Sequence, residues 1–595
     1  MKLFKKTASV VLAMTMVSAL CSTTAMVTTA SAVDTGAETT KLDVSEHQYK
    51  AYQIFKGTQA DTDNAVLCDI QWGEDIDEVA LLTALQKMDA YKDCKTAEDV
   101  AMVLAKIEEE ANGKTDTKEA REFAKLADQY IKKSTDDTVY GTNIGVTSTI
   151  DGKGLEVGYY LVVDTTSTFD TTAPNDDKNS VKNEAKNLSL LQLTKNTSSD
   201  IVSKTDIPKV EKKVYEKTPY VDDQKGTTGY ALEEGYNDVA DYYIGDDVKF
   251  MLIGTMPTTL EDYDTYKYVF HDTLSAGLTY NNDIEVFVDD DNMYGNDVKI
   301  GSGYTVDSKA DGTLTISFDD VKSVKDTSDK ALTVTKDSKI IVKYTAELND
   351  EAVIGLPGNP NEVYLQYSNN PNFNGSGDNG DGDDDGNNDN NETGNTPKDK
   401  VIVFTYELDV TKEDSETAEK LEGAEFKLQN ADGAFYKKVD IIDEENPENN
   451  SWYIEWVADE NAATTLISEN GMFKVVGIDD GTYTLTETKA PTGYNLLKEA
   501  IKITITAVTV NNQKWDVFEP ANALTALSIK ITGDKNATEG TGNVDTGIVD
   551  MSVKNNKGSL LPETGGMGTV AIYTVGTLLV VVAGVLLITK KRMSK

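Results

Sequence analysis

The stretch Gly481-Thr482-Tyr483-Thr484-Leu485-Thr486-Glu487 decides how the fold of this 595-residue chain is interpreted, because its apolar and polar side chains alternate. Successive side chains of a β-strand point to opposite faces, so Tyr483, Leu485 and Glu487 share one face. The same alternation is found in two further segments, in Tyr406, Leu408, Val410 and Lys412 and in Met551, Val553 and Asn555. Three strands of one region therefore each place a polar residue, Lys412, Glu487 or Asn555, on an apolar face.

A second region, upstream of the first, has the same arrangement. Lys212 lies on the strand face of Val210 and Val214, whereas its neighbour Lys213 is expected to point to water. Two more polar residues occupy apolar faces, namely Asp272 with Tyr268, Phe270 and Leu274, and Asn369 with Val363, Leu365 and Tyr367. The short alternating strands between about 209 and 373 predict an all-β sandwich.

A lysine and a carboxylic acid buried together have a specific chemistry. Desolvation lowers the pKa of the lysine and raises that of the acid, which favours a neutral amine beside a protonated carboxyl group. If an asparagine carboxamide carbon is held next to this amine, the amine attacks it, the acid shuttles the proton and ammonia leaves. We therefore predict two internal isopeptide bonds, with the promoting acids as the catalytic residues: Lys212–Asn369 with Asp272, and Lys412–Asn555 with Glu487.

The C-terminal end has the sequence features of a membrane-spanning stop-transfer segment. An apolar run from Val570 to Thr589 precedes the basic residues Lys590-Lys591-Arg592. Twenty helical residues span about 30 Å, the thickness of a bilayer core, and the basic tail is retained inside the cell. Just before this run stands Leu561-Pro562-Glu563-Thr564-Gly565. A single-pass protein with a chance pentapeptide is the plain alternative.

The N-terminal end predicts export. Basic residues at Lys2, Lys5 and Lys6 precede the apolar stretch 8–20, and Ala30-Ser31-Ala32 offers a signal-peptide cleavage site after Ala32. Cleavage leaves Cys68 and Cys94 in the mature chain. Either these two cysteines form one disulfide outside the cell, or each is a small buried residue.

The composition excludes several classes of function. The chain has 101 Asp and Glu against 57 Lys and Arg, a net charge of −44, which makes nucleic acid a poor partner. Only His47 and His271 are histidines, too few for a histidine-based metal site or a histidine-dependent hydrolase. We expect no cofactor and no metal.

The chain divides into six segments, of mainly β structure in tandem immunoglobulin-like sandwiches. They are a signal peptide (1–32), an N-terminal β domain with a helical insertion (33–205), a β-sandwich (206–373), an acidic Asn/Asp/Gly-rich loop or linker (374–399), a second β-sandwich (400–558) and a C-terminal signal with a transmembrane helix and basic tail (559–595). In the N-terminal domain we predict helices at 77–88, after the cap Thr96-x-x-Asp99, and along the face of Ala120, Phe123, Ala127 and Tyr130. The acidic segment lacks the Glu that closes an EF-hand loop, so we expect a solvated loop.

Several stretches resemble known families. Two stretches resemble the B-type repeat of collagen adhesins and pilins, a prealbumin-like sandwich. They are Leu421-Glu422-Gly423-Ala424-Glu425-Phe426 and the run from Gly481 to Tyr494, which ends in Ala490-Pro491-Thr492-Gly493-Tyr494. In that family the Glu of the Gly-x-Tyr-x-Leu-x-Glu run assists the Lys–Asn bond, which carries over to Glu487. Leu561 to Gly565, with the helix and basic tail, resembles the cell-wall sorting signal of Gram-positive surface proteins.

Taken together, the chain resembles a major backbone pilin of a Gram-positive sortase-assembled fimbria. The resemblance implies that sortase cleaves between Thr564 and Gly565 and joins Thr564 to a lysine of the next subunit. The family's Tyr-Pro-Lys-Asn motif is absent. Lys204, in Val202-Ser203-Lys204-Thr205-Asp206-Ile207-Pro208, is favoured because an exposed interdomain joint presents an amine well; Lys195, in Leu193-Thr194-Lys195-Asn196, is the alternative.

The partners implied by this resemblance are a pilin-specific and a housekeeping sortase, identical subunits, peptidoglycan, ancillary pilins and host ligands. The chain would be exported, held briefly in the membrane and then attached covalently to the cell wall. Two other functions stay open at this point. One is a monomeric wall-anchored adhesin with the same domains, and the other is a wall-attached glycan hydrolase with paired carboxylates.

Overall fold

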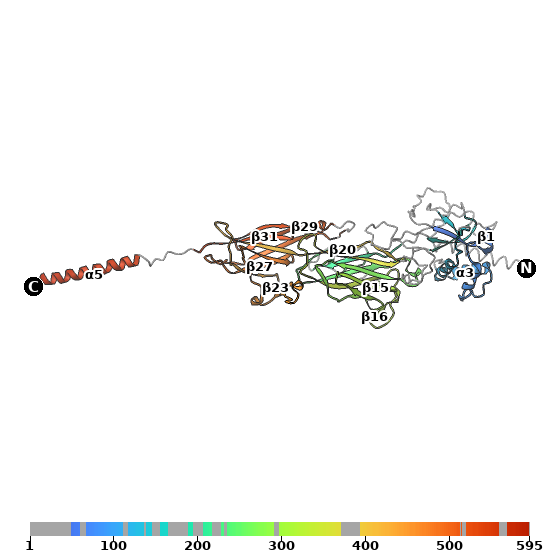
Figure 1. Cartoon of the computed structure of the whole chain (residues 1–595), viewed down its shortest axis with the longest axis horizontal. Coiled ribbons are helices and arrows are strands. Elements are labelled where there is room, and N and C mark those ends of the chain that lie inside the picture. Colours follow the sequence, from blue (N-terminus) through green and yellow to red (C-terminus); the bar gives the residue numbers. More distant parts are fainter. Residues whose placement is uncertain are drawn as a thin grey trace.

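The computed structural model has an elongated chain in which three modules follow one another along the long axis (Figure 1). The structure describes residues 49–59, 67–110, 117–135, 138–144, 155–164, 188–193, 206–216, 228–230, 232, 235–290, 297–369, 393–511, 513, 519–558 and 568–593. The predicted class, mainly β with a helical insertion in the N-terminal part and one C-terminal apolar helix, is confirmed.

The N-terminal module packs three helices on one sheet. The sheet order is β2-β1-β4-β5, with β3 paired to β1. Its strands are β1 (Tyr49–Gln59), β2 (Leu67–Trp72), β3 (Thr142–Ile144), β4 (Gly158–Asp164) and β5 (Leu188–Leu193), and the helices are α2 (Glu78–Leu85), α3 (Ala97–Glu110) and α4 (Lys118–Gln129).

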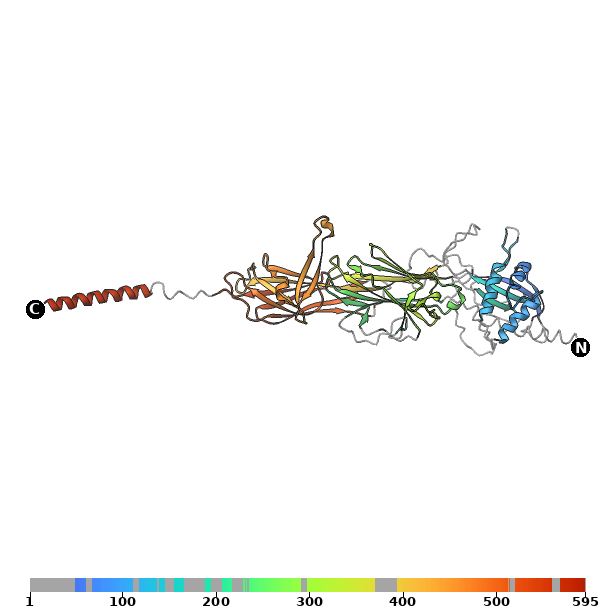
Figure 2. The ribbon, with the colours of Figure 1, turned by 90° about the horizontal axis from the view of Figure 1, so that it is seen from below.

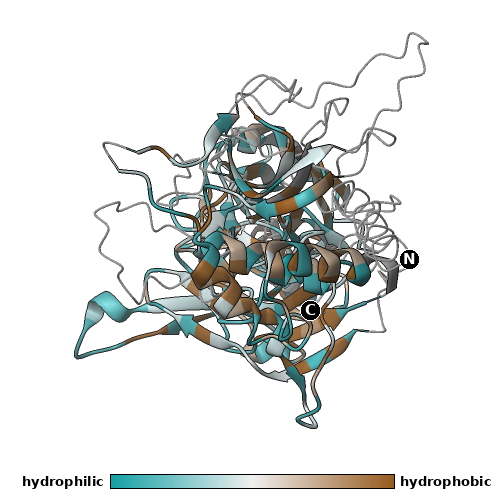
Figure 3. Cartoon of the chain, turned by 90° about the vertical axis from the view of Figure 1, so that its right-hand side faces the viewer, coloured by the Kyte–Doolittle hydropathy of each residue, from teal (hydrophilic) through white to brown (hydrophobic). Residues whose placement is uncertain are grey.

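Local capping explains where these helices begin. Asp77 and Thr117 accept hydrogen bonds from backbone N–H groups of the first turns of α2 and α4, and Thr96 and Asp99 cap α3 reciprocally. The apolar face of α4, with Ala120, Phe123 and Ala127, is buried. Helices nearest the viewer in Figure 3 carry both apolar and polar residues, as amphipathic helices do.

The middle module is a sandwich of two large sheets. One has the order β14-β15-β10-β18-β20-β8, with β19 beside β18, and the other has the order β16-β13-β12-β17-β9-β6-β7, with β11 beside β17. The strands are β6 (Val210–Tyr215), β7 (Tyr236–Asn237), β8 (Val239–Asp241), β9 (Asp247–Thr255), β10 (Tyr268–Leu274), β11 (Leu278–Tyr280), β12 (Glu285–Asp289), β13 (Val298–Ser302), β14 (Thr305–Ser308), β15 (Thr313–Phe318), β16 (Lys325–Asp326), β17 (Lys339–Leu348), β18 (Asn359–Ser368), β19 (Thr393–Asn395) and β20 (Asp399–Phe404). Two 3₁₀ turns, η2 (Leu260–Asp262) and η3 (Val321–Ser323), connect them.

The predicted domain boundary at 400 is wrong by several residues. Strand β20 pairs with β18 and β8 and therefore belongs to the middle module, and β19 lies inside the segment predicted to be a loop. Val401 and Val403 are buried in the middle core, whereas Ile402 and Phe404 on the opposite face join the C-terminal core. The strand has apolar residues on both faces because it lies between two cores, which the sequence alone does not distinguish from a domain start.

The C-terminal module is also a two-sheet sandwich, with orders β26-β21-β31-β30 and β24-β23-β22-β27-β28-β29. Its strands are β21 (Tyr406–Asp414), β22 (Glu425–Gln429), β23 (Phe435–Ile441), β24 (Ser451–Val457), β25 (Leu466–Ile467), β26 (Met472–Ile478), β27 (Gly481–Lys489), β28 (Ile501–Thr509), β29 (Leu524–Gly533), β30 (Ala537–Asn543) and β31 (Ile548–Asn555), with the 3₁₀ turns η4 (Pro447–Asn449), η5 (Glu460–Ala462) and η6 (Pro520–Asn522). The first strand β21 and the last strand β31 are parallel neighbours. The hairpin β23–β24 projects from the module (Figure 2).

The middle and C-terminal modules share backbone hydrogen bonds. Ile244 donates to the Gly477 carbonyl at 2.8 Å, and Ile454 donates to the Ile244 carbonyl at 2.9 Å. Gly355 and Gly547 have positive φ values and approach so closely that a Cβ atom on Gly355 would lie 2.2 Å from the Gly547 nitrogen. The two modules therefore pack directly against each other through their backbones.

The C-terminal helix α5 (Gly568–Met593) ends in Lys590, Lys591 and Arg592. Residues 571–593 form a helix long and apolar enough to cross a membrane, and none of its most apolar window is buried inside the described part of the protein. This helix fits a membrane anchor with a basic end on the inner side.

Candidate functional site

Lys412, Glu487 and Asn555 lie together inside the C-terminal module, and all three are buried. Lys412 and Asn555 come from the neighbouring strands β21 and β31, and Glu487 comes from β27 in the other sheet. The Lys412 Nζ atom is 4.0 Å from Glu487 Oε1 and donates to the Val553 carbonyl at 3.2 Å. Asn555 Nδ2 donates to both Glu487 oxygens at 3.0 Å. The structure thus brings the three predicted residues into one cluster.

The electrostatics of this cluster suit proton transfer. Burial lowers the pKa of Lys412 to about 8, although the Glu487 carboxylate opposes the shift. Burial also raises the pKa of Glu487, against a hydrogen bond from the Leu497 N–H group. The two pKa values therefore move toward each other, which reduces the free energy needed to pass a proton from the amine to the acid.

Lys212 and Asp272 form the corresponding pair in the middle module. Lys212 on β6 and Asp272 on β10 face each other from opposite sheets, and neither side chain has measurable exposure. Lys212 Nζ donates to both Asp272 oxygens at 2.7 Å. Burial lowers the pKa of Lys212 to about 8 and raises that of Asp272, while each charge opposes the shift of the other.

Asn369 is not part of this cluster, so its assignment as the partner of Lys212 is contradicted. Asp272 pairs with Val363 in the register of β10 and β18. Asn369 is six residues further along the chain, and six residues of extended strand span about 20 Å. Its buried side chain has no hydrogen-bond partner among the residues that the structure describes.

The asparagine that the structure does bring to the site is Asn361, which sequence reasoning missed. It is fully buried, lies two residues before Val363 on β18 and shares its face. Its Nδ2 donates to the Tyr344 hydroxyl at 2.8 Å, and this hydroxyl in turn donates to Asp272 Oδ2 at 2.8 Å and accepts from Lys212 Nζ at 3.1 Å. The alternation Val363, Leu365, Tyr367 extended backward by one step would have found it.

Tyr344, on β17, is a second residue of this site that the sequence did not single out. Its ring and that of Phe250 lie under the amine, with ring centroids 5.6 Å and 5.5 Å from Lys212 Nζ. These rings exclude water from the amine. The Tyr344 hydroxyl links the lysine, the aspartic acid and the asparagine in one hydrogen-bonded network.

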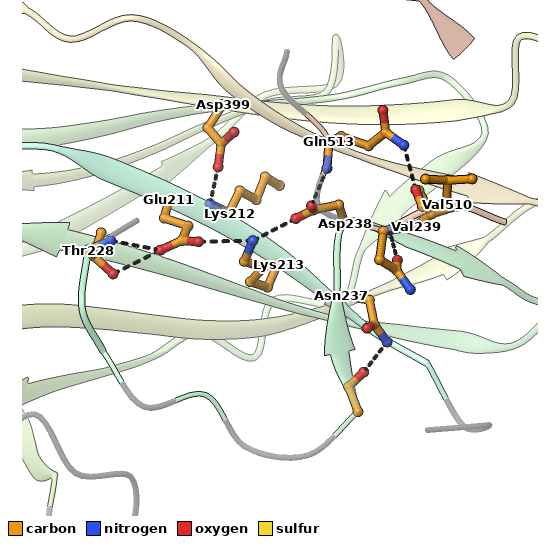
Figure 4. Close-up of polar contacts among 12 residues, drawn as sticks. Glu211, Lys212, Lys213, Thr228, Asn237, Asp238, Val239, Asp399, Val510 and Gln513 are labelled. Atoms are coloured by element: carbon orange, nitrogen blue, oxygen red, sulfur yellow. Dashed lines mark hydrogen bonds and ion pairs between the residues drawn. The ribbon is translucent and has the colours of Figure 1, made fainter. Parts of the chain in front are cut away.

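The prediction that Lys213 points to water is wrong. Its side chain is buried and forms ion pairs with Glu211 at 2.9 Å and Asp238 at 2.6 Å (Figure 4). Asp238 also accepts from the backbone N–H group of Gln513, in the C-terminal module, at 2.8 Å. The outer face of β6 is covered by the segment that contains Asp238, which strand alternation alone does not reveal.

Several predicted residues lie outside the described part of the chain. These are the cleavage site Ala32, the two candidate lysines Lys195 and Lys204, the motif from Leu561 to Gly565, and most of the acidic segment 374–399. Cys68 is half-buried, Cys94 is buried, and both are free thiols. Among the residues that the structure describes, no group of His, Cys, Asp and Glu side chains has the arrangement of a metal site.

Two protein-family models match the chain. Residues 244–371 match the Gram-positive pilin backbone subunit 2, Cna-B-like domain, and residues 406–516 match the SpaA prealbumin-like fold domain. The chain is also 26% identical over 441 residues to the trypsin-resistant surface T6 protein of Streptococcus pyogenes serotype M6, covering 66% of this chain and 70% of that protein.

Solved structures of similar proteins include two streptococcal backbone pilins. The T6 backbone pilin of serotype M6 Streptococcus pyogenes has 17% identity and a TM-score of 0.43, over 87% of this chain and 97% of that one. The pilus 2b backbone protein of group B streptococcus has 25% identity and a TM-score of 0.35, over 54% of this chain and 97% of that one. The resemblance to backbone pilins inferred from the sequence is confirmed by the family models and the T6 relative.

Proposed function

We propose that this chain is cross-linked internally and polymerised covalently. Its pilin backbone domain, its prealbumin-like domain and its homology to a streptococcal surface protein support a structural pilus subunit. The observation that carries the proposal is that each of the two matched modules buries a lysine, a carboxylic acid and an asparagine in one cluster. Such a cluster costs stability unless it reacts or is fully paired. Its use for covalent bonding explains why both modules contain it.

In the C-terminal module the bond is Lys412–Asn555. The Lys412 amine first passes a proton to Glu487, which lies 4.0 Å away, and then attacks Cγ of Asn555. Glu487 returns the proton to Nδ2, to which it is already hydrogen-bonded at 3.0 Å. The new C–N bond replaces the Cγ–Nδ2 bond. Glu487 also takes the second proton from the attacking nitrogen, and this proton departs with ammonia as ammonium. Glu487 is a carboxylate again at the end, so no cofactor is consumed.

In the middle module we propose the bond Lys212–Asn361, promoted by Asp272. Asp272 takes a proton from the amine at 2.7 Å. The Tyr344 hydroxyl, 2.8 Å from both Asp272 and Asn361 Nδ2, can relay the proton to the leaving nitrogen. The asparagine oxygen Oδ1 has no hydrogen-bond partner in the described structure, which leaves the carboxamide free to turn its carbon toward the amine.

These bonds suit a protein that transmits force. Each one joins the first strand of a module to its last or nearly last strand, so tension can cross the module without unfolding it. In the chain-entropy model, closing a loop longer than about 100 residues removes roughly 5 kcal/mol of unfolded-state entropy. Covalent closure therefore protects both modules against heat and protease as well.

Polymerisation would use the two ends of the subunit. We propose that sortase cleaves Thr564–Gly565 and that the Thr564 carbonyl forms an amide with Lys204 of the next subunit, with Lys195 as the alternative acceptor. The last subunit would be transferred to peptidoglycan, so the apolar helix is a temporary anchor. A donor at one end and an acceptor on the joint one domain away from the opposite end give a head-to-tail contact that does not close, which produces a fibre.

The test compares two lysines in cells that carry the pilin-specific sortase. Lys204→Ala should abolish the high-mass ladder seen by immunoblot of cell-wall extracts and leave wall-linked monomer, whereas Lys195→Ala should leave the ladder intact. The reverse pattern would assign Lys195 as the acceptor. If both variants, and the double variant, still polymerise like the wild type, neither lysine is the acceptor; a wild-type chain without any ladder would favour a monomeric adhesin.

A further inference from the structure

The motif Ala490-Pro491-Thr492-Gly493-Tyr494 directly precedes the residues whose backbone contacts the C-terminal cluster. It forms a turn in which the Tyr494 N–H group donates to the Pro491 carbonyl at 3.1 Å. Gly493 has a φ of 88° in this turn, a conformation that favours glycine. The residues that follow pass along the buried side chains of Glu487 and Asn555.

Two backbone groups of this segment contact the reacting residues. The Asn495 carbonyl accepts from Asn555 Nδ2 at 2.9 Å, and the Leu497 N–H group donates to Glu487 Oε2 at 2.8 Å. Asn555 Nδ2 therefore faces three acceptor oxygens, namely the Asn495 carbonyl and the two carboxylate oxygens of Glu487. If the carboxamide were turned over, its oxygen would face the same acceptors without a proton, so the Asn495 carbonyl fixes which end of the amide meets Glu487.

Tyr494 anchors this segment to the strand beside Asn555. Its hydroxyl donates to Asp414 Oδ2 at 2.7 Å, and Asp414 is the residue opposite Asn555 in the register of β21 and β31. Asp414 is itself buried and held by the N–H groups of Glu416 and Thr417 at 2.7 Å and 3.0 Å. On the far side, the Asn495 N–H group donates to the Asn556 carbonyl at 2.9 Å.

We propose that Tyr494 is a positioning residue for the Lys412–Asn555 reaction. Through its bond to Asp414 it holds the Asn495 carbonyl against Asn555, so that the leaving nitrogen stays beside Glu487 and Cγ stays open to the amine of Lys412. The inference rests on the proposed Lys412–Asn555 bond. It predicts that loss of the Tyr494 hydroxyl, which bonds to Asp414 and not to a reacting residue, slows the release of ammonia.

The experiment measures how fast the bond forms. The full chain from Val33 is made by cell-free synthesis, samples are quenched in acid at intervals, and the cross-linked peptide of Lys412 and Asn555 is quantified by mass spectrometry after proteolysis. Tyr494→Phe should slow its appearance by about tenfold or more. The rate should fall at every pH while the midpoint of its pH profile stays that of the wild type, because Tyr494 acts on position and not on the proton affinity of the amine.

The matched control is Tyr483→Phe. Tyr483 lies in the same module, and its hydroxyl also makes one hydrogen bond, to the Asp479 carbonyl at 2.8 Å, away from the cluster. This variant should form the bond at the wild-type rate. The inference is overturned if Tyr494→Phe reacts as fast as the wild type, or if Tyr483→Phe is slowed equally.

Failure of the underlying bond is distinguishable from failure of the inference. If the wild-type chain never yields the cross-linked peptide, the proposed bond is wrong, and the role of Tyr494 falls with it. If the wild type reacts and Glu487→Ala does not, the bond stands, and the two tyrosine variants then decide the role of Tyr494 alone. The double variant Glu487→Ala, Tyr494→Phe, compared with Glu487→Ala by circular dichroism, shows whether the fold survives the loss of the hydroxyl.

Discussion

Lys212 and Lys213 are neighbours on one strand and both are buried, yet their amines meet opposite environments. Lys212 enters the core between two aromatic rings, and its amine forms an ion pair with Asp272. Lys213, on the other face of β6, meets the carboxylates of Glu211 and Asp238. The two residues differ little in sequence context, but one carboxylate forms an ion pair with the Lys212 amine and two form ion pairs with the Lys213 amine.

This difference decides what each amine can do. Burial lowers the pKa of Lys212 to about 8, because the opposing charges of Asp272, Asp399 and Glu362 do not offset the loss of water. Burial would also lower the pKa of Lys213, but the carboxylates of Asp238, Glu211 and Asp399 together outweigh burial and hold that pKa above its usual range. A lysine with two acids stays a cation and forms a stable ion pair, whereas a lysine with one acid and a nearby carboxamide can become a nucleophile.

The largest effect is expected from Asp272→Ala. Without the acid the proposed Lys212–Asn361 bond should not form, so the variant should retain one ammonia, about 17 Da above the mass calculated for the cross-linked form. Loss of roughly 5 kcal/mol should lower the melting temperature of the middle module by roughly 10 to 20 °C. Intact-mass spectrometry and calorimetry measure both. A variant with the cross-linked mass would show that Asp272 is not needed.

Two asparagine variants sharpen the assignment of the bond. Asn361→Ala should also abolish the loss of ammonia from the middle module, because it removes the carboxamide that shares the Tyr344 hydroxyl with Asp272. Asn369→Ala should leave the ammonia loss unchanged. The comparison is made by mass spectrometry of the cross-linked peptides, and the opposite result would restore Asn369 as the partner of Lys212.

A smaller effect is expected from Lys213→Met. The substitution leaves Glu211 and Asp238 buried without their cation, which should cost about 3 to 5 kcal/mol in urea unfolding. The mass should differ from that of the wild type by the substitution alone, because Lys213 forms no covalent bond. Lys213→Arg keeps the charge and should lose less stability. If the wild-type protein showed a further loss of ammonia or water that maps to Lys213, Lys213 would form a covalent bond, and the contrast with Lys212 would be wrong.

The smallest effect concerns pH and is seen only when the bond is absent. In Asn361→Ala the free Lys212 has a folded pKa of about 8, below its unfolded value of 10.5, so the unfolded state binds more protons between these values. Stability should therefore rise with pH from about 8 to about 10, by up to about 3 kcal/mol. Lys213, whose folded pKa is raised, contributes equally throughout this window.

The control for the pH dependence of Asn361→Ala is the double variant Lys212→Met, Asn361→Ala, which lacks the titrating amine. The difference between the two variants in urea unfolding at several pH values isolates Lys212 from other groups that titrate in the same range. Equal pH dependence in both variants would mean that Lys212 keeps its proton in the folded core, and the distinction between the two lysines would then be lost.

The sequence by itself determined the features that depend on short-range periodicity. Strand alternation has a period of two, so it places Lys412, Glu487 and Asn555 on apolar faces without knowledge of any partner strand. The caps of the N-terminal helices and the length of the apolar C-terminal segment are local in the same way. These features gave the mainly β class and most residues of both clusters.

Only the tertiary structure decided which residues of those faces meet. Asn361 lies on β18 and Asn369 directly follows its last residue, and the register that sets Asp272 opposite Val363 selects Asn361. The burial of Lys213 requires the segment that carries Asp238, and the place of β20 requires pairing with β18 and β8. Register and coverage arise from contacts between residues far apart in the chain, and alternation within one strand contains no information about them.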